Sequence, residues 1–140
     1  MFPLLFRVEI VPVPCSRPKV TKRGTVYYPK RYTMYKGVLA ALLKACYVNT
    51  HNKEAPIEGP VSIDYLFVLP RPKYMKKGYY TGLCLHPKRP DLDNLLKGVN
   101  DALEWGGILK NDCQITDSSS KKRYAEREGT PRIELTIKQT

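Results

Sequence analysis

The sequence predicts an α+β domain in which a small mixed β-sheet is covered by two helices. Two segments have the apolar spacing of amphipathic helices, and four others have the composition of β-strands. The chain has 140 residues, of which 42% are hydrophobic, and this length suits one domain with a core of its own. We therefore expect a single domain over residues 1–140.

The N-terminal third is expected to form a strand, a basic hairpin and a helix. The strand covers Leu4–Val11, because Pro12 and Pro14 close it. Residues 16–33 place basic side chains among three tyrosines around a Lys-Arg-Gly turn, which is typical of a hairpin or loop. Thr33 can then cap a helix over residues 34–48. Its expected buried face consists of Tyr35, Val38, Leu39, Leu42 and Cys46.

The later strands are predicted from segments that are rich in β-branched and aromatic residues. The segment Val61–Leu69 is the clearest of them, and Pro70 stops it. Residues 71–82 form a second basic and aromatic loop, which we expect to be mobile. The segments Ile115–Tyr124 and Pro131–Lys138 are expected to pair as an antiparallel hairpin through a turn at 126–130. The last strand would point Ile133, Leu135 and Ile137 inward.

The segment that organises the chain is residues 87–107. Its apolar residues recur at the spacing of one helical face: Leu92, Leu95, Leu96, Val99, Ala102 and Leu103. Pro90 precedes the helix, and Gly106 and Gly107 end it. Roughly fourteen residues lie between these limits, which corresponds to a helix about 21 Å long.

The polar side of this helix allows two interpretations. Along one stripe run Asp93, Lys97, Asn100 and Glu104, and Asp91 stands at the helix start. In the first interpretation Asp91 is an N-cap, and Asp93 and Lys97 form an ordinary surface pair. In the second, the two carboxylates converge on one hard cation and Lys97 reaches the same ligand.

The charge distribution favours metal-dependent chemistry on nucleic acid. The formal net charge is +11 and the pI is near 9.6. Residues 1–53 carry ten basic groups and one acid, Glu9, whereas six of the thirteen acids fall between residues 91 and 117. A basic arm suits a polyanion, but a cluster of acids repels the same polyanion unless a cation bridges the two. The expected phosphate contacts are Arg17, Lys19, Lys22, Arg23, Lys30, Arg31, Lys88 and Arg89.

Other classes of protein are disfavoured. The four cysteines contain no C-x-x-C pair, and neither histidine has zinc-ligand spacing from them, so we expect reduced thiols and no zinc site. The sequence contains no run of eighteen apolar residues, so no membrane span is predicted. The N-terminal apolar segment is too short for a signal peptide, and a cytoplasmic location is the expectation.

The same residues resemble a known family. The segment PDLDNLLKGVNDALEWGGILKNDCQI and the terminal IELTI resemble the RusA family of Holliday junction resolvases. The family pattern is D-L-D-N-L-x-K, then D-A-L, then D-x-Q, and it matches Asp91, Asp93, Asn94, Lys97 and Asp112. Some members have two adjacent acids where this chain has Asn111 and Asp112, so only Asp112 is carried over. The basic segment at residues 71–82 is expected to shape substrate choice.

The resemblance implies a RusA-like homodimer that binds four-way DNA junctions and nicks two strands symmetrically with Mg²⁺ or Mn²⁺. It implies that Asp91, Asp93 and Asp112 are metal ligands, that Lys97 stabilises charge on the scissile phosphate, and that Asn94 orients a ligand or contacts phosphate.

Four alternatives remain open at this point, and the least favoured is a structural module of a larger assembly. A non-catalytic basic nucleic-acid-binding protein would need the basic arm but not the acids, and it would show no metal dependence. A nuclease acting on other branched DNA would use the same site on a different substrate. A nuclease class with a P-D motif and a later acid-x-Lys is echoed by Pro90 and Asp91, but its second element is missing.

Overall fold

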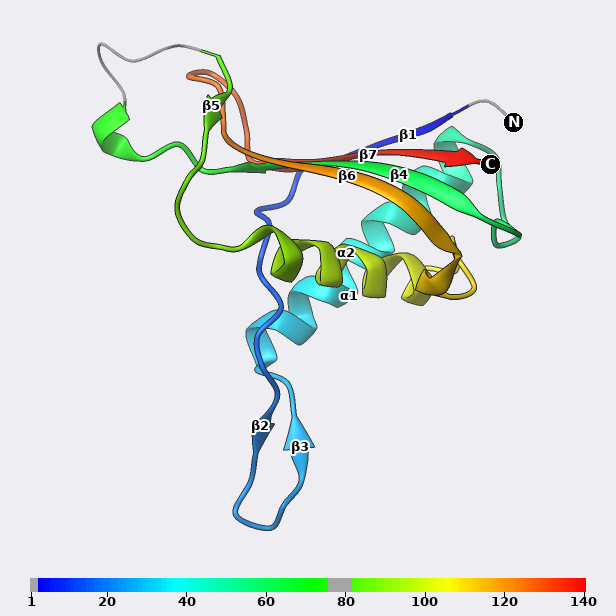
Figure 1. Cartoon of the computed structure of the whole chain (residues 1–140), viewed down its shortest axis with the longest axis horizontal. Coiled ribbons are helices and arrows are strands. Elements are labelled where there is room, and N and C mark those ends of the chain that lie inside the picture. The colour runs from blue at the N-terminus through cyan, green and yellow to red at the C-terminus, as the bar shows by residue number, and fades with distance from the viewer. Residues whose placement is uncertain (1–2, 76–81) are drawn as a thin grey trace.

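Residues 3–75 and 82–140 are the part of the chain that the computed structural model describes, and within it five strands form a mixed sheet. The strands are β1 (Leu4–Val8), β4 (Val61–Leu69), β5 (Cys84–Leu85), β6 (Ile115–Tyr124) and β7 (Arg132–Gln139). Two helices, α1 (Lys30–Ala45) and α2 (Leu92–Trp105), lie together on one face of this sheet (Figure 1). The predicted α+β class with a mixed sheet and two covering helices is confirmed.

The apolar strand β4 occupies the middle of the sheet, whose order is β1-β7-β4-β6-β5. It pairs in parallel with β6 and antiparallel with β7. The predicted β6–β7 hairpin is therefore wrong, because β4 lies between the two strands. At their turn, the backbone amide of Ala125 donates to the carbonyl of Leu69 at 2.8 Å, so the connection crosses the end of β4. A strand with buried side chains on both faces, here Phe67 and Val68, gains most from this central place.

The helix α1 begins four residues earlier than predicted, after Pro29 instead of Thr33. Its buried residues are Tyr32, Tyr35, Leu39, Ala40 and Leu43. Of the predicted buried face, Val38 and Leu42 are instead 52% and 37% exposed, and Cys46 is half-buried. Apolar residues lie on two sides of α1, so periodicity alone allowed two faces. The structure buries the side that includes the large rings of Tyr32 and Tyr35. A π-helical turn, Cys46–Thr50, follows α1.

The burial of α1 gives a testable difference between neighbouring residues. Leu39 is fully buried, so Leu39→Ala is expected to lower the free energy of unfolding by about 2–5 kcal/mol. Val38→Ala is expected to change it by no more than about 0.5 kcal/mol, because the Val38 side chain already faces solvent. Denaturant unfolding of the two variants measures both values. Equal losses would place Val38 in the core and contradict this orientation of the helix.

The core lies between the sheet and the two helices. From the sheet come Phe6, Ile63, Phe67 and, as predicted, Ile133, Leu135 and Ile137 of β7. From α2 come Leu95, Val99, Ala102 and Leu103, while the predicted Leu92 and Leu96 are partly buried against the same cluster. Because these side chains are buried, the helix α2 has little freedom to rotate about its axis, and its polar stripe is held in a fixed orientation.

Several boundaries differ from the expectations. The strand β1 ends at Val8, whose partner is Ile133, and its pairing with β7 stops there. The predicted basic hairpin is confirmed by β2 (Lys19–Val20) and β3 (Val26–Tyr27), and it projects away from the body of the molecule (Figure 1). Of the predicted loop at 71–82, Lys73–Met75 form a 3₁₀ turn and residues 76–81 lie outside the described residues. No helix in the described ranges is long and apolar enough to cross a membrane.

Candidate active site at the start of α2

The helix α2 presents its amino-terminal acids to solvent. Asp91 is the N-cap residue, as predicted, but its side chain makes no capping hydrogen bond with the described backbone, and it is exposed. Asp93, in the first turn, is also exposed, and its Oδ1 accepts the backbone amide of Asn94 at 3.0 Å. Neither carboxylate takes part in a salt bridge within the described ranges. Two exposed carboxylates thus stand two residues apart.

Lys97 lies one turn further along the helix and points away from Asp93. Its Nζ lies 3.8 Å from Oδ1 of Asp101, so the surface pair forms with the acid that follows it along α2. The predicted Asp93–Lys97 pair is not formed. An exposed pair of this kind contributes about 0.2–1 kcal/mol, so little holds the Lys97 ammonium in place.

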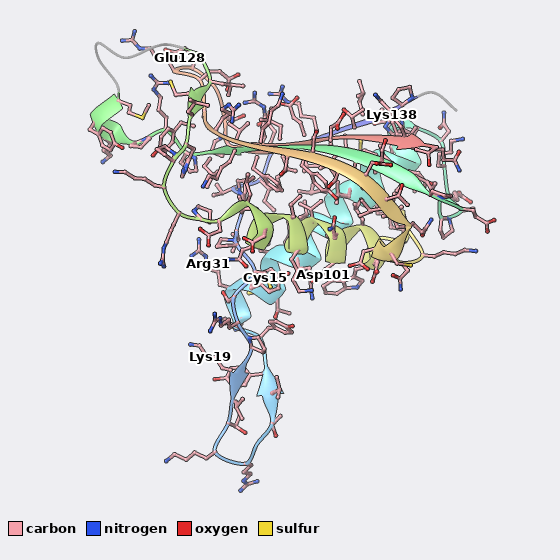
Figure 2. The ribbon with its side chains drawn as sticks, viewed as in Figure 1. Cys15, Lys19, Arg31, Asp101, Glu128 and Lys138 are labelled. Atoms are coloured by element: carbon pink, nitrogen blue, oxygen red, sulfur yellow. The ribbon has the colours of Figure 1, made fainter. Side chains whose placement is uncertain are left out.

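A pocket of about 560 Å³ gathers predicted site residues from distant parts of the chain. Asp91 and Asn94 line it from α2, Arg89 from the preceding loop, and Arg31 from the first turn of α1. The backbone amide of Cys15 donates to the carbonyl of Asn94 at 2.9 Å and fixes the segment before the hairpin against α2. Figure 2 shows Cys15 and Arg31 at this end of the two helices. Basic and acidic side chains therefore meet in one cavity.

Asp112 lies elsewhere, in the 3₁₀ turn Asp112–Gln114 that follows α2. Its backbone amide donates to Oε1 of Glu104 at 2.5 Å. Glu104 follows Asp93 by eleven residues, or about 16 Å of helix axis. The structure thus does not bring Asp112 beside Asp91 and Asp93. Among the described residues, no three of the His, Cys, Asp and Glu side chains are close enough to hold one ion.

A hydrogen bond connects the middle of α2 to strand β4 of the sheet. The Tyr65 hydroxyl donates to Oδ1 of Asn100 at 2.6 Å. Burial raises the pKa of Tyr65 and the charge of Asp112 raises it further, while the bond to Asn100 opposes the shift. Tyr65 therefore stays protonated and donates at any physiological pH.

The pair Asp91 and Asp93 fits a hard divalent cation. It offers carboxylate oxygens only, which suit Mg²⁺ or Mn²⁺ better than Zn²⁺. Mg²⁺ in enzymes commonly keeps several waters and binds one or two carboxylates together with substrate phosphate. Asp91 lines the pocket together with Arg31 and Arg89, which suit phosphate, and Asp93 follows Asp91 by two residues at the same helix start.

The predicted basic residues fall into two groups. Four lie on the projecting hairpin segment, where all are exposed: Arg17, Lys19, Lys22 and Arg23. Lys19 marks this arm in Figure 2. The other four surround the start of the two helices and are also exposed: Lys30, Arg31, Lys88 and Arg89. Two cations in the first turn of α1 are unfavourable for the helix dipole, and a bound anion would relieve this repulsion.

A positioning residue that the sequence did not reveal is Lys122 of β6. Its Nζ donates to the backbone carbonyls of Lys88 and Pro90, at 2.5 and 2.7 Å. These bonds hold the loop that leads into Asp91. Lys122 is opposite Phe67 in the β4–β6 register and so faces the helices. The alternation of side chains along β6 could have indicated that Lys122 faces inward, but only if the pairing of β6 with β4 had been known.

Loss of this tether is expected to slow catalysis. If the site cleaves DNA, as the sequence resemblance implies, Lys122→Met should lower the rate of cleavage about tenfold or more, because small displacements of catalytic groups cost large factors in rate. Lys121→Met is the matched control, since it removes the same charge from an exposed neighbour on the other face of β6. Single-turnover rates at saturating enzyme measure both. Equal rates for the two variants would show that the loop does not need Lys122.

Two comparisons bear on the identity of the chain. The family model described as endodeoxyribonuclease RusA matches residues 9–138. The uncharacterized protein YqaN of Bacillus subtilis (strain 168) is 34% identical over 143 residues, which cover 96% of this chain and 94% of that protein. The matched region includes both helices, the whole of β4, β6 and the basic hairpin. The chain therefore belongs to the RusA family of endodeoxyribonucleases, the family of Holliday junction resolving enzymes that its D-L-D-N helix resembled.

Proposed function

We propose that this chain is a Mg²⁺-dependent endodeoxyribonuclease that binds four-way DNA junctions and resolves them by paired, symmetric nicks. The observation that carries the proposal is the pocket at the start of α2, where Arg31 and Arg89 meet Asp91 and Asn94. The arginines suit phosphate, and Asp91, with Asp93 two residues further along α2, suits a cation that neutralises it. A protein that only bound DNA would gain nothing from an acid such as Asp91 in that cavity.

In this proposal Asp91 and Asp93 hold the ion, and Asp112 completes the set. Bound Mg²⁺, or Mn²⁺ on the same oxygen ligands, supplies an activated water and neutralises charge on the scissile phosphate. Because Asp112 contacts Glu104 in the structure, its participation requires the Asp112 turn to move toward the start of α2 when metal and DNA bind. Asn94, which lines the same pocket as Asp91, orients a carboxylate or contacts phosphate.

Lys97 stabilises the negative charge that develops on the phosphate during cleavage. Its side chain is 56% exposed, and its only described ion pair is the weak contact with Asp101. A flexible, exposed ammonium one turn from Asp93 can turn toward a phosphate that binds beside the two acids.

The basic hairpin contributes phosphate contacts outside the pocket. Removing Arg17, Lys19 and Arg23 together is expected to weaken junction binding. The slope of log affinity against log salt concentration should become shallower by roughly 0.9 for each lost phosphate contact. Removing Lys44, Lys53 and Lys138 is the control, because these exposed lysines lie outside the predicted DNA-binding set. Binding titrations at several salt concentrations give both slopes. A hairpin variant with the wild-type slope would show that this arm does not touch DNA.

Two symmetric nicks call for two copies of the site, and one chain carries one D-L-D-N helix. We therefore propose a homodimer, whose two-fold symmetry matches that of the junction. Mixing wild-type protein with excess Asp93→Asn protein should convert paired incision into single nicks. Resolved product that falls only in proportion to the wild-type fraction would contradict a dimer. A nuclease with this substrate acts where the cell keeps its DNA, so we also propose a cytoplasmic location.

A panel of labelled substrates tests the substrate class. Purified protein with Mg²⁺ is expected to cut a four-way junction at related positions on opposed strands, and to leave a linear duplex of the same sequence intact. Forks and flaps in the same panel test the second candidate, a nuclease for other branched DNA. Tight binding to every substrate with no cleavage of any would instead establish a non-catalytic DNA-binding protein.

A further inference from the structure

A second pocket, of about 510 Å³, lies beside the carboxyl-terminal half of α2. Its lining combines two aromatic side chains, three lysines and two acids: Tyr28, Trp105, Lys36, Lys97, Lys110, Asp101 and Glu104. Of these, only Lys97 belongs to the site residues predicted from the sequence. The pocket therefore adjoins the candidate active site through Lys97 but has a different chemical character.

The aromatic walls are exposed. Trp105 is the single tryptophan of the chain, and 58% of it is accessible to solvent, while Tyr28 is 41% accessible. Residues of this size are usually much more buried in a folded domain. The Nζ of Lys36 lies 5.6 Å from the centre of the Trp105 ring and 5.8 Å from that of Tyr28. One cation from α1 thus lies over both rings, and the two aromatic residues remain partly exposed to solvent.

The polar groups suit a nucleotide. Lys97 and Lys110 are each more than half exposed; their ammonium groups lie 3.8 Å from Asp101 and 2.7 Å from Glu58, and each keeps further N–H donors for a phosphate. Glu104 uses Oε1 to accept the amide of Asp112, and its Oε2 accepts from no described residue. A carboxylate oxygen in this position can accept from an amino group on the edge of a base.

We propose that this pocket binds an unpaired nucleobase of the DNA, stacked on Trp105 and Tyr28, close to the phosphate that is cut. The proposal rests on the proposed function for the nature of the substrate. Base faces stack on aromatic side chains irrespective of sequence, and nearby cations add to the interaction. In a duplex these faces are covered by neighbouring bases, whereas at a branch point a base leaves the stack at lower cost. The pocket would therefore favour flexible branch points over linear duplex.

A different explanation is that the rings only shield Lys36 and hold α1 against α2. Trp105 does contact this interface, since its ring lies 3.5 Å from the position that a side chain at Gly37 would occupy. Two substitutions separate the explanations. Trp105→Phe keeps an aromatic face, whereas Trp105→Leu keeps apolar volume without one. A purely structural role would treat the two alike in DNA binding.

The test uses Asp93→Asn protein in EDTA, so that no DNA is cut. The fluorescence of Trp105 is expected to be quenched by a single-stranded oligonucleotide and by a four-way junction, and much less by a linear duplex. In anisotropy titrations with labelled oligonucleotide, adding Trp105→Leu should weaken affinity about tenfold, while adding Trp105→Phe retains most of it. Tyr28→Leu, which removes the other ring, should also weaken binding and serves if Trp105→Leu fails to fold.

The outcomes distinguish the two proposals. Junction DNA that binds without quenching Trp105, or equal affinities for the leucine and phenylalanine variants, would overturn the nucleobase pocket. Cleavage of the junction by wild-type protein would leave the proposed function intact in that case. A protein that neither binds nor cuts the junction would overturn the proposed function itself.

Discussion

Replacing Asp93 by asparagine is expected to abolish strand cleavage while leaving junction binding intact or tighter. The substitution keeps the size of the side chain and its acceptor oxygen toward the amide of Asn94, but it removes the charge that a divalent cation requires. The loss of a negative charge near phosphate also reduces repulsion of DNA. Single-turnover cleavage and a binding titration in EDTA measure the two effects separately.

Asp117→Asn is the matched control, because Asp117 is an exposed acid of β6 outside the proposed site. It should cut DNA at the wild-type rate. Asp112→Asn in the same series tests the third ligand, whose position in the structure is remote from Asp93. If Asp112 joins the ion during catalysis, its substitution should be as damaging as that of Asp93. Wild-type cleavage by Asp93→Asn would refute the metal assignment as a whole.

Lys97→Ala is expected to lower the cleavage rate about 10²-fold or more, with little change in affinity for the junction. Loss of one group that stabilises transition-state charge commonly costs this much. If Lys97 served only as the partner of Asp101, cleavage would continue at nearly the wild-type rate, and the free energy of unfolding would fall by under about 0.5 kcal/mol.

Lys44→Ala, at an exposed lysine in the last turn of α1, controls for the loss of one positive charge. Single-turnover rates at saturating enzyme separate the chemical step from binding. A Lys97→Ala rate equal to that of Lys44→Ala would remove Lys97 from the mechanism.

The elements that the sequence predicted well are those with strong local signals. The apolar face of α2 from Leu95 to Leu103, the strand β4 and the turn of the hairpin each follow from residues close together in the chain. The strand partners did not follow in this way. The segments β6 and β7 are consecutive and suit a hairpin, but β4 is more apolar than β6 and takes the place between them. Which strand pairs with β6 and β7 depends on the packing of the whole sheet, and no short segment of the sequence indicates it.

The same limit applies to the site. The spacing of Asp91 and Asp93 was visible in the sequence, and the helix start keeps them together. The meeting of Arg31 with Asp91 depends on how α1 crosses α2, and the start of α1 was placed four residues too late. The position of Asp112 depends on the path of the chain after Gly107, where φ is +75°. Residue spacing could not show how far this turn lies from the helix start.

The most direct test of the account uses a supercoiled plasmid that extrudes a cruciform, which presents a four-way junction. Two matched nicks across the junction convert the plasmid to a linear molecule, whereas one nick gives an open circle. With Mg²⁺ the wild-type protein is expected to produce linear plasmid, and with EDTA it should produce none while still binding the DNA. Linear product formed without divalent metal, or open circles alone at saturating wild-type protein, would contradict a metal-dependent enzyme that resolves junctions by paired nicks.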